Sequence, residues 1–437
     1  MTASLDTAEL YSLLIFDPRS GKFICDNSSG HSALPVAEGH TKERLARALC
    51  SQIKTVLGIS ALLLWVDRKQ HPKQAVFEWL FPNERLNEGF SLCSCGNRTD
   101  APTQQFDQDL ISRLREGRKD LGRFARPGWM RDLAGLWEFD SILDVEHWNC
   151  GVDFCLAKIR TASGSYWFKA VGAPNTQEFA NTMAVVELAP DVSPKVVFAH
   201  PEWNAWVTTD IPGLSLDEPH SEKDAVAVLR SLADLQTRSI TTVPSLRGLG
   251  MEDYSTDFVR HSLPLFFRHA ADAMAAQVST KSTPLSAAAL MKMQEDCRIM
   301  LERYCGLGIA DAIVHGDIGH GNVFLTPEGP VFLDWAEAWI THPFVGAEIL
   351  IASLSDHSSC QGDGMLRAIY AECWRGVCTD PDLSWAQLYS PVLGALVYAF
   401  VLWQKSRSSS DPIRHWPLLR SLLREADRRL IVAMGSE

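Results

Sequence analysis

The chain has 437 residues, of which 46% are apolar and 22% are charged, and its formal net charge is −12. This is the composition of a globular protein long enough to bury a large core, and its acidity argues against a general nucleic-acid-binding protein. The eleven cysteines include one Cys-x-Cys pair, Cys93 and Cys95, and no Cys-x-x-Cys pair. We therefore expect reduced thiols, no structural zinc and a cytoplasmic location.

No membrane-spanning or secretory segment is expected. The N-terminal stretch lacks a basic segment followed by a long apolar run, which a signal peptide needs. No uninterrupted apolar run reaches the ~18 residues that span a bilayer. The longest candidate, residues 391–403, ends at Gln404 and Lys405 and predicts a buried helix.

Residues 1–130 mix strand and helix patterns. We expect three strands and two helices here, at residues 12–16, 22–24, 60–66, 42–57 and 105–116. A turn-rich loop is expected at 93–103. The strand–helix–strand order faintly resembles a Nudix hydrolase domain, a family that holds its metal on a glutamate-rich helix. Here the helix carries only Glu43, so we expect a non-catalytic α/β domain; the alternative is hydrolysis of a nucleoside diphosphate compound.

Residues 131–213 are rich in strands. The two runs on either side of the turn at 161–164 predict a β-hairpin. The expected strands and helix of this region are 153–160, 165–171, 195–199, 205–209 and the helix 176–188.

Residues 214–437 are mostly helical. One apolar stripe predicts a helix at 223–238. Thr283 and Pro284 predict an N-cap and a first-turn proline for a second helix that ends near Tyr304.

A stretch at 313–339 gathers the side chains with the clearest chemistry. Two apolar runs, 323–325 and 331–333, flank a five-residue turn and predict an antiparallel hairpin. Asn322 precedes the first run and Asp334 follows the second, so an amide oxygen and a carboxylate should meet at the open end. Mg²⁺ accepts such ligands beside water and phosphate.

The loop that enters this hairpin carries a further carboxylate. Asp317 lies five residues before Asn322, close enough to face a nucleophile beside the metal. The preceding pair, His315 and Gly316, predicts a tight loop whose backbone needs space.

His315-Gly316-Asp317, Asn322, the apolar hairpin and Asp334-Trp335 together resemble the aminoglycoside phosphotransferase and choline kinase-like family of the protein-kinase-like superfamily. The resemblance implies an α+β, two-lobed fold. Residues 131–213 would form a small antiparallel-sheet lobe and 214–437 a larger helical lobe with the acceptor site. It also implies that Asp317 is the catalytic base, and that Asn322 and Asp334 hold Mg²⁺ beside ATP or GTP.

The family's nucleotide-binding parts have counterparts upstream. Lys169 would contact the phosphates and Glu178 would hold that lysine; Glu187 is the competing glutamate. A stretch ending at Gly213 resembles the hinge between lobes, where backbone groups of Thr209 to Ile211 would bond the base. The chain departs from the family in the phosphate-covering loop, expected at 146–154, which has one glycine, Gly151. The usual aspartate after Asp334-Trp335 is also missing; either Glu348 replaces it or this anchor is absent.

These residues predict a small-molecule kinase that moves the γ-phosphoryl group of ATP or GTP to a hydroxyl group. The alternative is a pseudokinase, a nucleotide-binding scaffold without turnover. Six acidic residues with two tryptophans interleaved would suit an amine-bearing acceptor, or they form a solvated acidic surface: Glu348, Asp356, Asp363, Glu372, Asp380, Asp382, Trp374 and Trp385. We expect no nucleic-acid or membrane partner.

Overall fold

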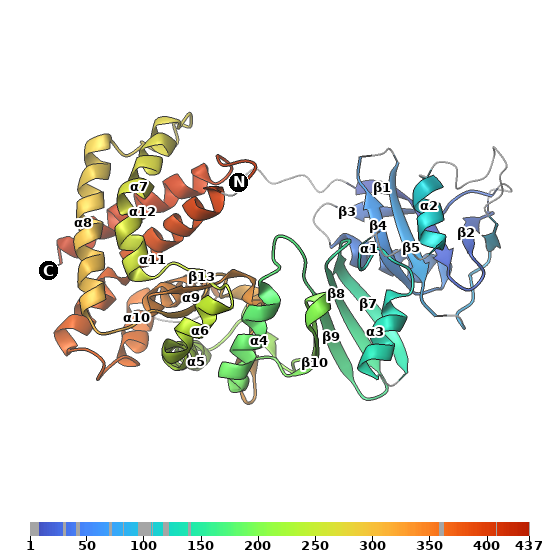
Figure 1. The fold of residues 1–437 in the computed structure, drawn as a ribbon, viewed down its shortest axis with the longest axis horizontal. Helices are drawn as coiled ribbons and strands as arrows, with labels where there is room; N and C mark the ends of the chain where they lie inside the picture. Colours follow the sequence, from blue (N-terminus) through green and yellow to red (C-terminus); the bar gives the residue numbers. More distant parts are fainter. Residues whose placement is uncertain are drawn as a thin grey trace. The chain divides into compact units, whose positions relative to one another are not determined.

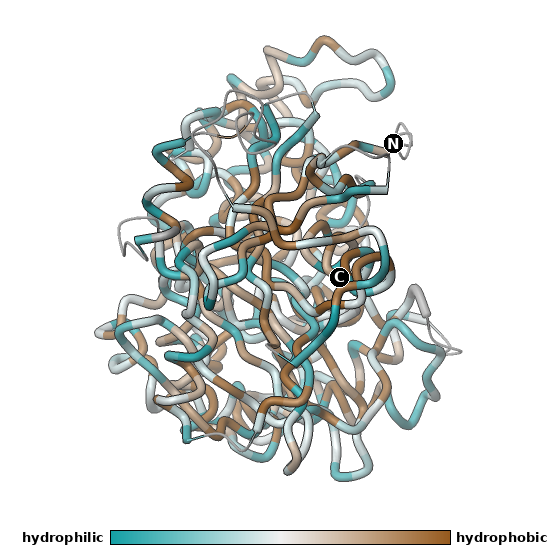
Figure 2. Tube along the Cα trace, turned by 90° about the vertical axis from the view of Figure 1, so that its right-hand side faces the viewer, coloured by the Kyte–Doolittle hydropathy of each residue, from teal (hydrophilic) through white to brown (hydrophobic). Residues whose placement is uncertain are grey.

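The computed structural model describes residues 8–28, 32–40, 44–69, 72–81, 83–94, 106, 108–116, 122–138, 141–357, 362–407 and 409–436. The chain divides into two compact units (Figure 1). The first, here the N-terminal unit, comprises Met1–Phe179 and Lys195–Asp210, and the second, the helical unit, comprises Ala180–Pro194 and Ile211–Glu437. In Figure 2 apolar stretches run mostly through the interior of the trace, and hydrophilic ones lie along its outer loops.

The N-terminal unit contains two sheets. Its strands are β1 (Ala8–Asp17), β2 (Lys22–Asp26), β3 (Val36–His40), β4 (Ala61–Asp67), β5 (Lys73–Trp79), β6 (Phe90–Cys93), β7 (Ile142–Cys150), β8 (Cys155–Thr161), β9 (Ser165–Ala170), β10 (Val196–His200) and β11 (Ala205–Thr209). Its helices are α1 (Leu45–Leu57), α2 (Gln108–Arg115) and α3 (Trp129–Trp137). The first sheet has the order β4-β5-β1-β2-β6 with β3 beside β1, and the second is antiparallel with the order β10-β11-β9-β8-β7.

Strand β1 reads as an unbroken apolar run because both of its faces are covered. Leu13 and Ile15 lie in the cluster that packs against α1, whereas Leu14 and Phe16 lie in a second cluster on the opposite face. Successive side chains of a strand point to opposite faces, so a strand between two layers needs apolar residues at every position.

The second cluster joins the two sheets. It includes Leu14 and Leu64 of the first sheet and Phe168 and Val207 of the second. Trp129 of α3 belongs to this cluster and is fully buried, with its ring stacked on Phe168 at a centroid distance of 5.7 Å. The first 130 residues and the antiparallel sheet therefore share one hydrophobic core.

Polar contacts also cross this junction. The backbone N–H of Leu63 on β4 donates to His147 Nδ1 on β7 over 3.2 Å, and Cys150 Sγ donates to the Leu63 carbonyl over 3.6 Å. β4 is an edge strand with an irregularity between Leu63 and Trp65. The free backbone groups of this edge are thus paired by side chains of β7.

We expect the junction to make stability dependent on pH. Burial lowers the pKa of His147 to about 4, below the ~6.5 of an unfolded chain. The unfolded state binds more protons between these values, so stability falls as pH falls. The unfolding free energy should drop by about 2 kcal/mol from pH 7 to pH 5 through this group. Urea unfolding of the wild type and His147→Gln at both pH values measures it. Equal pH dependence in the two proteins would contradict the assignment.

The helical unit combines helices with two three-stranded sheets. Its helices are α4 (Glu178–Leu188), which begins at the end of the N-terminal unit, α5 (Glu222–Ser239), α6 (Val243–Gly248), α7 (Thr256–Ala275), α8 (Ala287–Gly306), α9 (Pro343–His357), α10 (Asp363–Glu372), α11 (Asp380–Arg407) and α12 (Trp416–Met434). Its strands are β12 (Leu214–Ser215), β13 (Glu252–Asp253), β14 (Ala312–His315), β15 (Val323–Thr326), β16 (Gly329–Phe332) and β17 (Ala338–Thr341). The sheets have the orders β12-β15-β16 and β13-β17-β14.

The structure confirms an α+β fold with a small antiparallel-sheet lobe and a larger helical lobe. The apolar segment at 391–403 lies within α11, as expected, and its side chains are mostly buried. By length and composition α11 could also cross a membrane, but 78% of its apolar window is buried, as in the core helix of a globular unit. Sequence patterns did not indicate β3, β5, β6, β7 or α3. Cys95, Glu43 and most of the loop expected at 93–103 lie outside the described residues.

The start of α8 corrects one expectation. Its N-cap is Ser286, whose Oγ accepts the N–H of Ala289 over 3.1 Å, and the helix begins at Ala287. Thr283 and Pro284 lie in the preceding loop, so the proline is not in the first turn. A competing cap three residues later satisfies a free backbone donor of the helix, which the Thr-Pro pattern alone cannot reveal.

This correction carries a measurable consequence. Ser286→Ala should lower the free energy of unfolding by about 1 kcal/mol, because the backbone N–H of Ala289 loses its acceptor. Thr283→Ala serves as the control and should change it by less than about 0.5 kcal/mol. Urea unfolding of both variants tests this assignment. A larger loss of unfolding free energy for Thr283→Ala than for Ser286→Ala would indicate that Thr283 is the N-cap.

Candidate active site

The predicted antiparallel hairpin is confirmed as β15 and β16. Val323 lies opposite Phe332 and Thr326 opposite Gly329, so the turn is shorter than expected and the second strand begins earlier. Gly329 adopts a positive φ of 136° at this turn. At the open end, the backbone N–H of Leu333 donates to the carbonyl of Asn322 over 2.8 Å. Asn322 and the residue after Leu333, Asp334, therefore lie at the same end of the hairpin.

The entering loop places Asp317 against Asn322. The Nδ2 group of Asn322 donates to the backbone carbonyl of Asp317 over 2.9 Å and to its Oδ2 over 3.2 Å. The carboxylate of Asp317 is exposed. The other carboxylate oxygen, Oδ1, accepts no hydrogen bond from the part of the chain that is described. The three predicted residues of this loop and hairpin thus lie at one end of a single local structure.

His315 ties the loop to the hairpin, a role that its sequence position did not reveal. Its side chain is fully buried. Nε2 donates to the Leu333 carbonyl over 2.7 Å, and Nδ1 accepts the N–H of Asp317 over 3.2 Å. These partners require the neutral Nε2–H tautomer, and burial holds the pKa of His315 below its ordinary value. The imidazole is therefore a positioning group rather than a proton carrier.

Two backbone features shape this end of the hairpin. A Cβ atom at Gly316 would lie 2.3 Å from the ring of Trp339 and 2.5 Å from the carbonyl of Glu337, which explains the glycine. Asp334 has a φ of 63° and a ψ of 68°, a left-handed conformation that few non-glycine residues adopt. Such backbone outliers gather at functional sites, where surrounding contacts hold them.

One such contact comes from α4. The buried side chain of Asn181 donates through Nδ2 to the carbonyl of Trp335 over 3.2 Å. Asn181 lies one helical turn after Glu178 on α4, so both side chains lie on the same face of the helix. This spacing is the sequence feature from which a role for Asn181 could have been predicted.

The hairpin end suits Mg²⁺ in its donor chemistry. The Asp334 carboxylate is exposed, and Asn322 Oδ1 accepts no hydrogen bond from a described residue. Among the residues described, no group of three or more His, Cys, Asp or Glu side chains could hold a metal. Mg²⁺ is commonly bound by only one or two protein oxygens plus substrate phosphates, so Asn322 and Asp334 fit it.

In the N-terminal unit, the structure pairs the predicted lysine with the preferred glutamate. Lys169 Nζ lies 2.5 Å from Glu178 Oε1, and the two side chains are 23% and 2% exposed. The ammonium also lies 5.8 Å from the ring centre of Trp206, its neighbour on β11. The competing residue, Glu187, is exposed. Lys169 thus presents a fixed charge that is backed by a buried carboxylate.

Two of the three backbone N–H groups at residues 209–211 already donate hydrogen bonds within the protein. The backbone N–H of Thr209 donates to Lys195 O over 3.1 Å, and that of Asp210 donates to Ser165 O over 3.0 Å. The N–H of Ile211 has no backbone acceptor among the described residues. Of the donors expected to bond a nucleotide base, Ile211 is the one that remains available.

The expected phosphate-covering loop is the end of the β7–β8 hairpin. Cys150 lies opposite Cys155, and the N–H of Gly151 donates to Phe154 O over 2.9 Å. A Cβ atom at Gly151 would lie 2.3 Å from the ring of Phe154. The single glycine therefore lets an aromatic ring cover the turn.

Glu348 belongs to a buried ion pair in α9. Its carboxylate accepts two hydrogen bonds from Arg367, of 2.8 and 2.9 Å, and one of 2.5 Å from Ser390. This arrangement assigns Glu348 a structural role.

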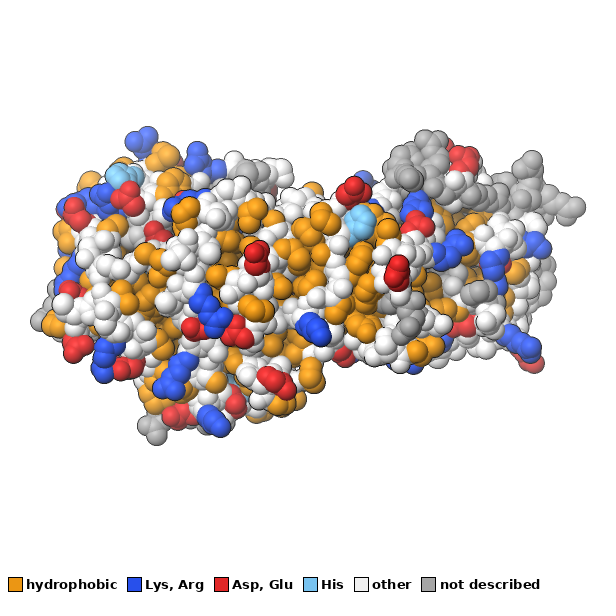
Figure 3. All heavy atoms as spheres, turned by 60° about the horizontal axis from the view of Figure 1, so that its bottom comes forward, with side chains coloured by type: hydrophobic (Ala, Val, Ile, Leu, Met, Phe, Trp, Pro, Cys, Tyr) orange, Lys and Arg blue, Asp and Glu red, His pale blue; other side chains and the backbone are white. Residues whose placement is uncertain are grey.

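The other described carboxylates of the proposed acidic surface also have partners. Asp363, Glu372, Asp380 and Asp382 each lie within 4 Å of an arginine, and the side chain of Asp356 lies outside the described residues. Trp374 and Trp385 are buried. On the face drawn in Figure 3, acidic and basic side chains are interspersed over the described residues. These residues form charge pairs rather than one cation-binding cluster.

Comparison with protein families matches part of the chain. Residues 169–376 match the model of the phosphotransferase enzyme family. No curated protein sequence matches the chain.

Several solved structures are similar in part. The macrolide 2'-phosphotransferase MphH from Brachybacterium faecium is 17% identical, with a TM-score of 0.43 over 67% of this chain and 96% of that one. The choline kinase LicA from Streptococcus pneumoniae is 13% identical, with a TM-score of 0.42 over 70% and 97%. A thermostable mutant of the aminoglycoside phosphotransferase APH(4)-Ia, solved with ADP and hygromycin B, is 13% identical, with a TM-score of 0.43 over 70% and 97%.

The family model begins at Lys169 and includes the loop and hairpin that carry Asp317, Asn322 and Asp334. Residues 169–376, just under half of the chain, thus match the phosphotransferase enzyme family, in agreement with the resemblance of its motifs to aminoglycoside phosphotransferases and choline kinase-like proteins.

Proposed function

We propose that the protein is a Mg²⁺-dependent small-molecule kinase that transfers the γ-phosphoryl group of ATP or GTP to a hydroxyl group. The observation that carries the proposal is the hydrogen bond from Asn322 Nδ2 to Asp317 Oδ2 at the hairpin end, next to Asp334. The Asn322 side chain would thereby orient the Asp317 carboxylate through its nitrogen, while its oxygen stays available to bind a cation.

Asp317 would act on the acceptor. Because Oδ2 is held by Asn322, Oδ1 is the oxygen that would orient the acceptor hydroxyl and take its proton. The acceptor oxygen forms a bond to the γ-phosphorus as the bond to the β,γ-bridging oxygen breaks, and the nucleoside diphosphate leaves. Most of the rate would come from positioning and electrostatics.

The remaining residues would bind the nucleotide. Lys169, fixed by Glu178, would neutralise phosphate charge. Asn322 and Asp334 would hold Mg²⁺, which when bound offsets the negative charge of the phosphates. The N–H of Ile211 would donate to the base.

Thermal unfolding with Mg·ATP and Mg·GTP tests this proposal, using the wild type and Asp334→Asn, since asparagine tolerates the left-handed backbone. A nucleotide at a hundredfold excess over its Kd should stabilise the wild type by about 2.7 kcal/mol, and the Mg²⁺-dependent part should vanish in the variant. No stabilisation by either nucleotide would contradict the proposal.

A second assay separates a kinase from a nucleotide-binding scaffold. Release of ADP or GDP is followed with choline, ethanolamine, a macrolide and an aminoglycoside, the acceptor classes named for similar proteins. Acceptor-dependent release supports transfer to a hydroxyl group. The paired state of the described acidic residues gives no preference for an amine-bearing acceptor over a neutral one.

A further inference from the structure

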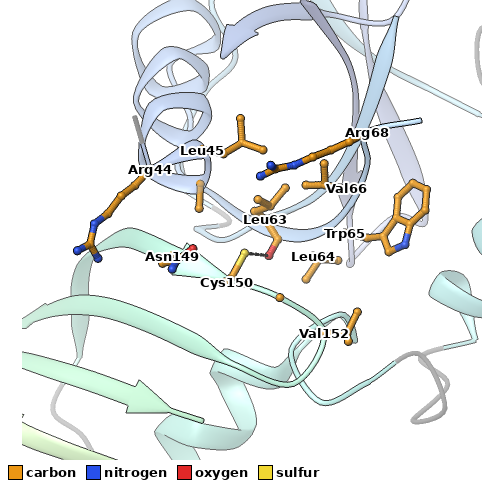
Figure 4. A pocket seen from close by; sticks show the side chains of 12 residues that line it. Arg44, Leu45, Leu63, Leu64, Trp65, Val66, Arg68, Asn149, Cys150 and Val152 are labelled. Carbon is orange, nitrogen blue, oxygen red and sulfur yellow. Dashed lines mark hydrogen bonds between the residues drawn. The ribbon is translucent and has the colours of Figure 1, made fainter. Parts of the chain in front are cut away.

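A cavity in the N-terminal unit lies beside the β7–β8 turn (Figure 4). Its volume is about 470 Å³, within the usual range of small-molecule sites. The first turn of α1 forms one wall, β4 a second, and the end of β7 with its turn the third. All three lie in one compact unit.

The lining combines apolar walls with positive charge. Leu45, Leu63 and Val66 supply apolar surface, and two arginines, Arg44 and Arg68, also line the cavity. The lining includes no Asp or Glu. The chain as a whole has a net charge of −12, but the charged residues lining this cavity are all positive. The cavity therefore favours a negatively charged ligand.

Arg68 is the group placed to hold that anion. In Figure 4 its side chain extends across the cavity toward Leu45 and Leu63, whereas Arg44 points away. The guanidinium of Arg44 lies 5.4 Å from the ring centre of Trp148. Arg68 forms no ion pair within the described part of the chain. Glu9 lies within its electrostatic reach, but the Glu9 carboxylate is paired with Lys73.

We propose that this cavity binds a small amphipathic organic anion, with its apolar or aromatic body between α1 and β4 and its carboxylate, sulfonate or phosphate group on Arg68. A planar guanidinium recognises such groups through paired hydrogen bonds. The side-chain amide of Asn149 and the backbone at Gly151 lie at the same cavity. The same cavity is therefore bordered by the turn of the hairpin expected to cover the nucleotide phosphates.

The site can be tested with the full chain and no nucleotide, so failure here leaves the proposed kinase activity untouched. The probe is 8-anilinonaphthalene-1-sulfonate, followed by fluorescence titration. Its neutral analogue, N-phenyl-1-naphthylamine, has the aromatic body without the sulfonate. We expect one saturable sulfonate site per chain in the wild type.

Three variants interpret the titration. Arg68→Gln should weaken the sulfonate about tenfold or more, the size of a lost charge-assisted hydrogen bond, and leave the neutral analogue unchanged. Arg85→Gln removes an exposed arginine of the same unit outside the cavity and should change neither. Val66→Trp, which fills the cavity, should abolish saturable binding of both. Arg68 is exposed, so its variant should fold. Unchanged sulfonate affinity in Arg68→Gln, or an equal loss in Arg85→Gln, would overturn the proposal.

Discussion

Asp317→Asn should lower kcat by about 10²–10⁴-fold, the usual contribution of a general base, once an acceptor has been identified. Asparagine keeps the size of the side chain and can still accept the hydrogen bond from Asn322 Nδ2. It cannot take a proton from the acceptor hydroxyl. Because Asp317 is exposed, the substitution should hardly change the free energy of unfolding. Its effect should appear in kcat.

The measurement is steady-state kinetics together with nucleotide binding by thermal shift. Nucleotide affinity should be nearly unchanged, since Asp317 acts on the acceptor. Glu328→Gln is the control, because it neutralises an exposed carboxylate at the turn of the same hairpin, far along the strands from the open end. Full turnover by Asp317→Asn would remove Asp317 from the proposed mechanism.

Arg367→Met should destabilise the protein by about 3–5 kcal/mol, because it strands a buried charge. The Glu348 side chain is 5% exposed and accepts two hydrogen bonds from Arg367, whose side chain is 17% exposed. Ser390 would remain as a hydrogen-bond donor to that carboxylate. The hydroxyl group of Ser390 carries no charge and cannot neutralise the Glu348 carboxylate. The loss of Arg367 should therefore account for most of the change in unfolding free energy.

Urea unfolding of Arg367→Met and of a matched surface variant measures this difference. Arg375→Met breaks an ion pair with Glu372 in which both side chains are more than half exposed, so its cost should be at most about 1 kcal/mol. The double variant Glu348→Gln with Arg367→Met should recover part of the loss, because no charge is left buried. Similar losses for Arg367→Met and Arg375→Met would show that burial of the pair contributes nothing.

Local patterns predicted the parts of the site that depend on chain neighbours. The hairpin and its two flanking residues could be read from sequence because a short turn holds two apolar runs close enough to pair with each other. Lys169 and Glu178 are close in sequence, so their pairing across one strand–helix connection was also accessible. The start of α8 could not be read correctly, since two cap patterns three residues apart compete and packing selects Ser286.

By itself, the sequence determined the α+β class, the loop and hairpin that carry Asp317, Asn322 and Asp334, and the family that residues 169–376 match. These features rest on periodicity and short spacings, which local chain geometry controls. Only the tertiary structure decided that the first 130 residues share a core with the antiparallel sheet, that Glu348 is held by Arg367, and that His315 bridges loop and hairpin. Each of these depends on groups far apart along the chain or on which side chain becomes buried, and burial is set by the packing of whole elements.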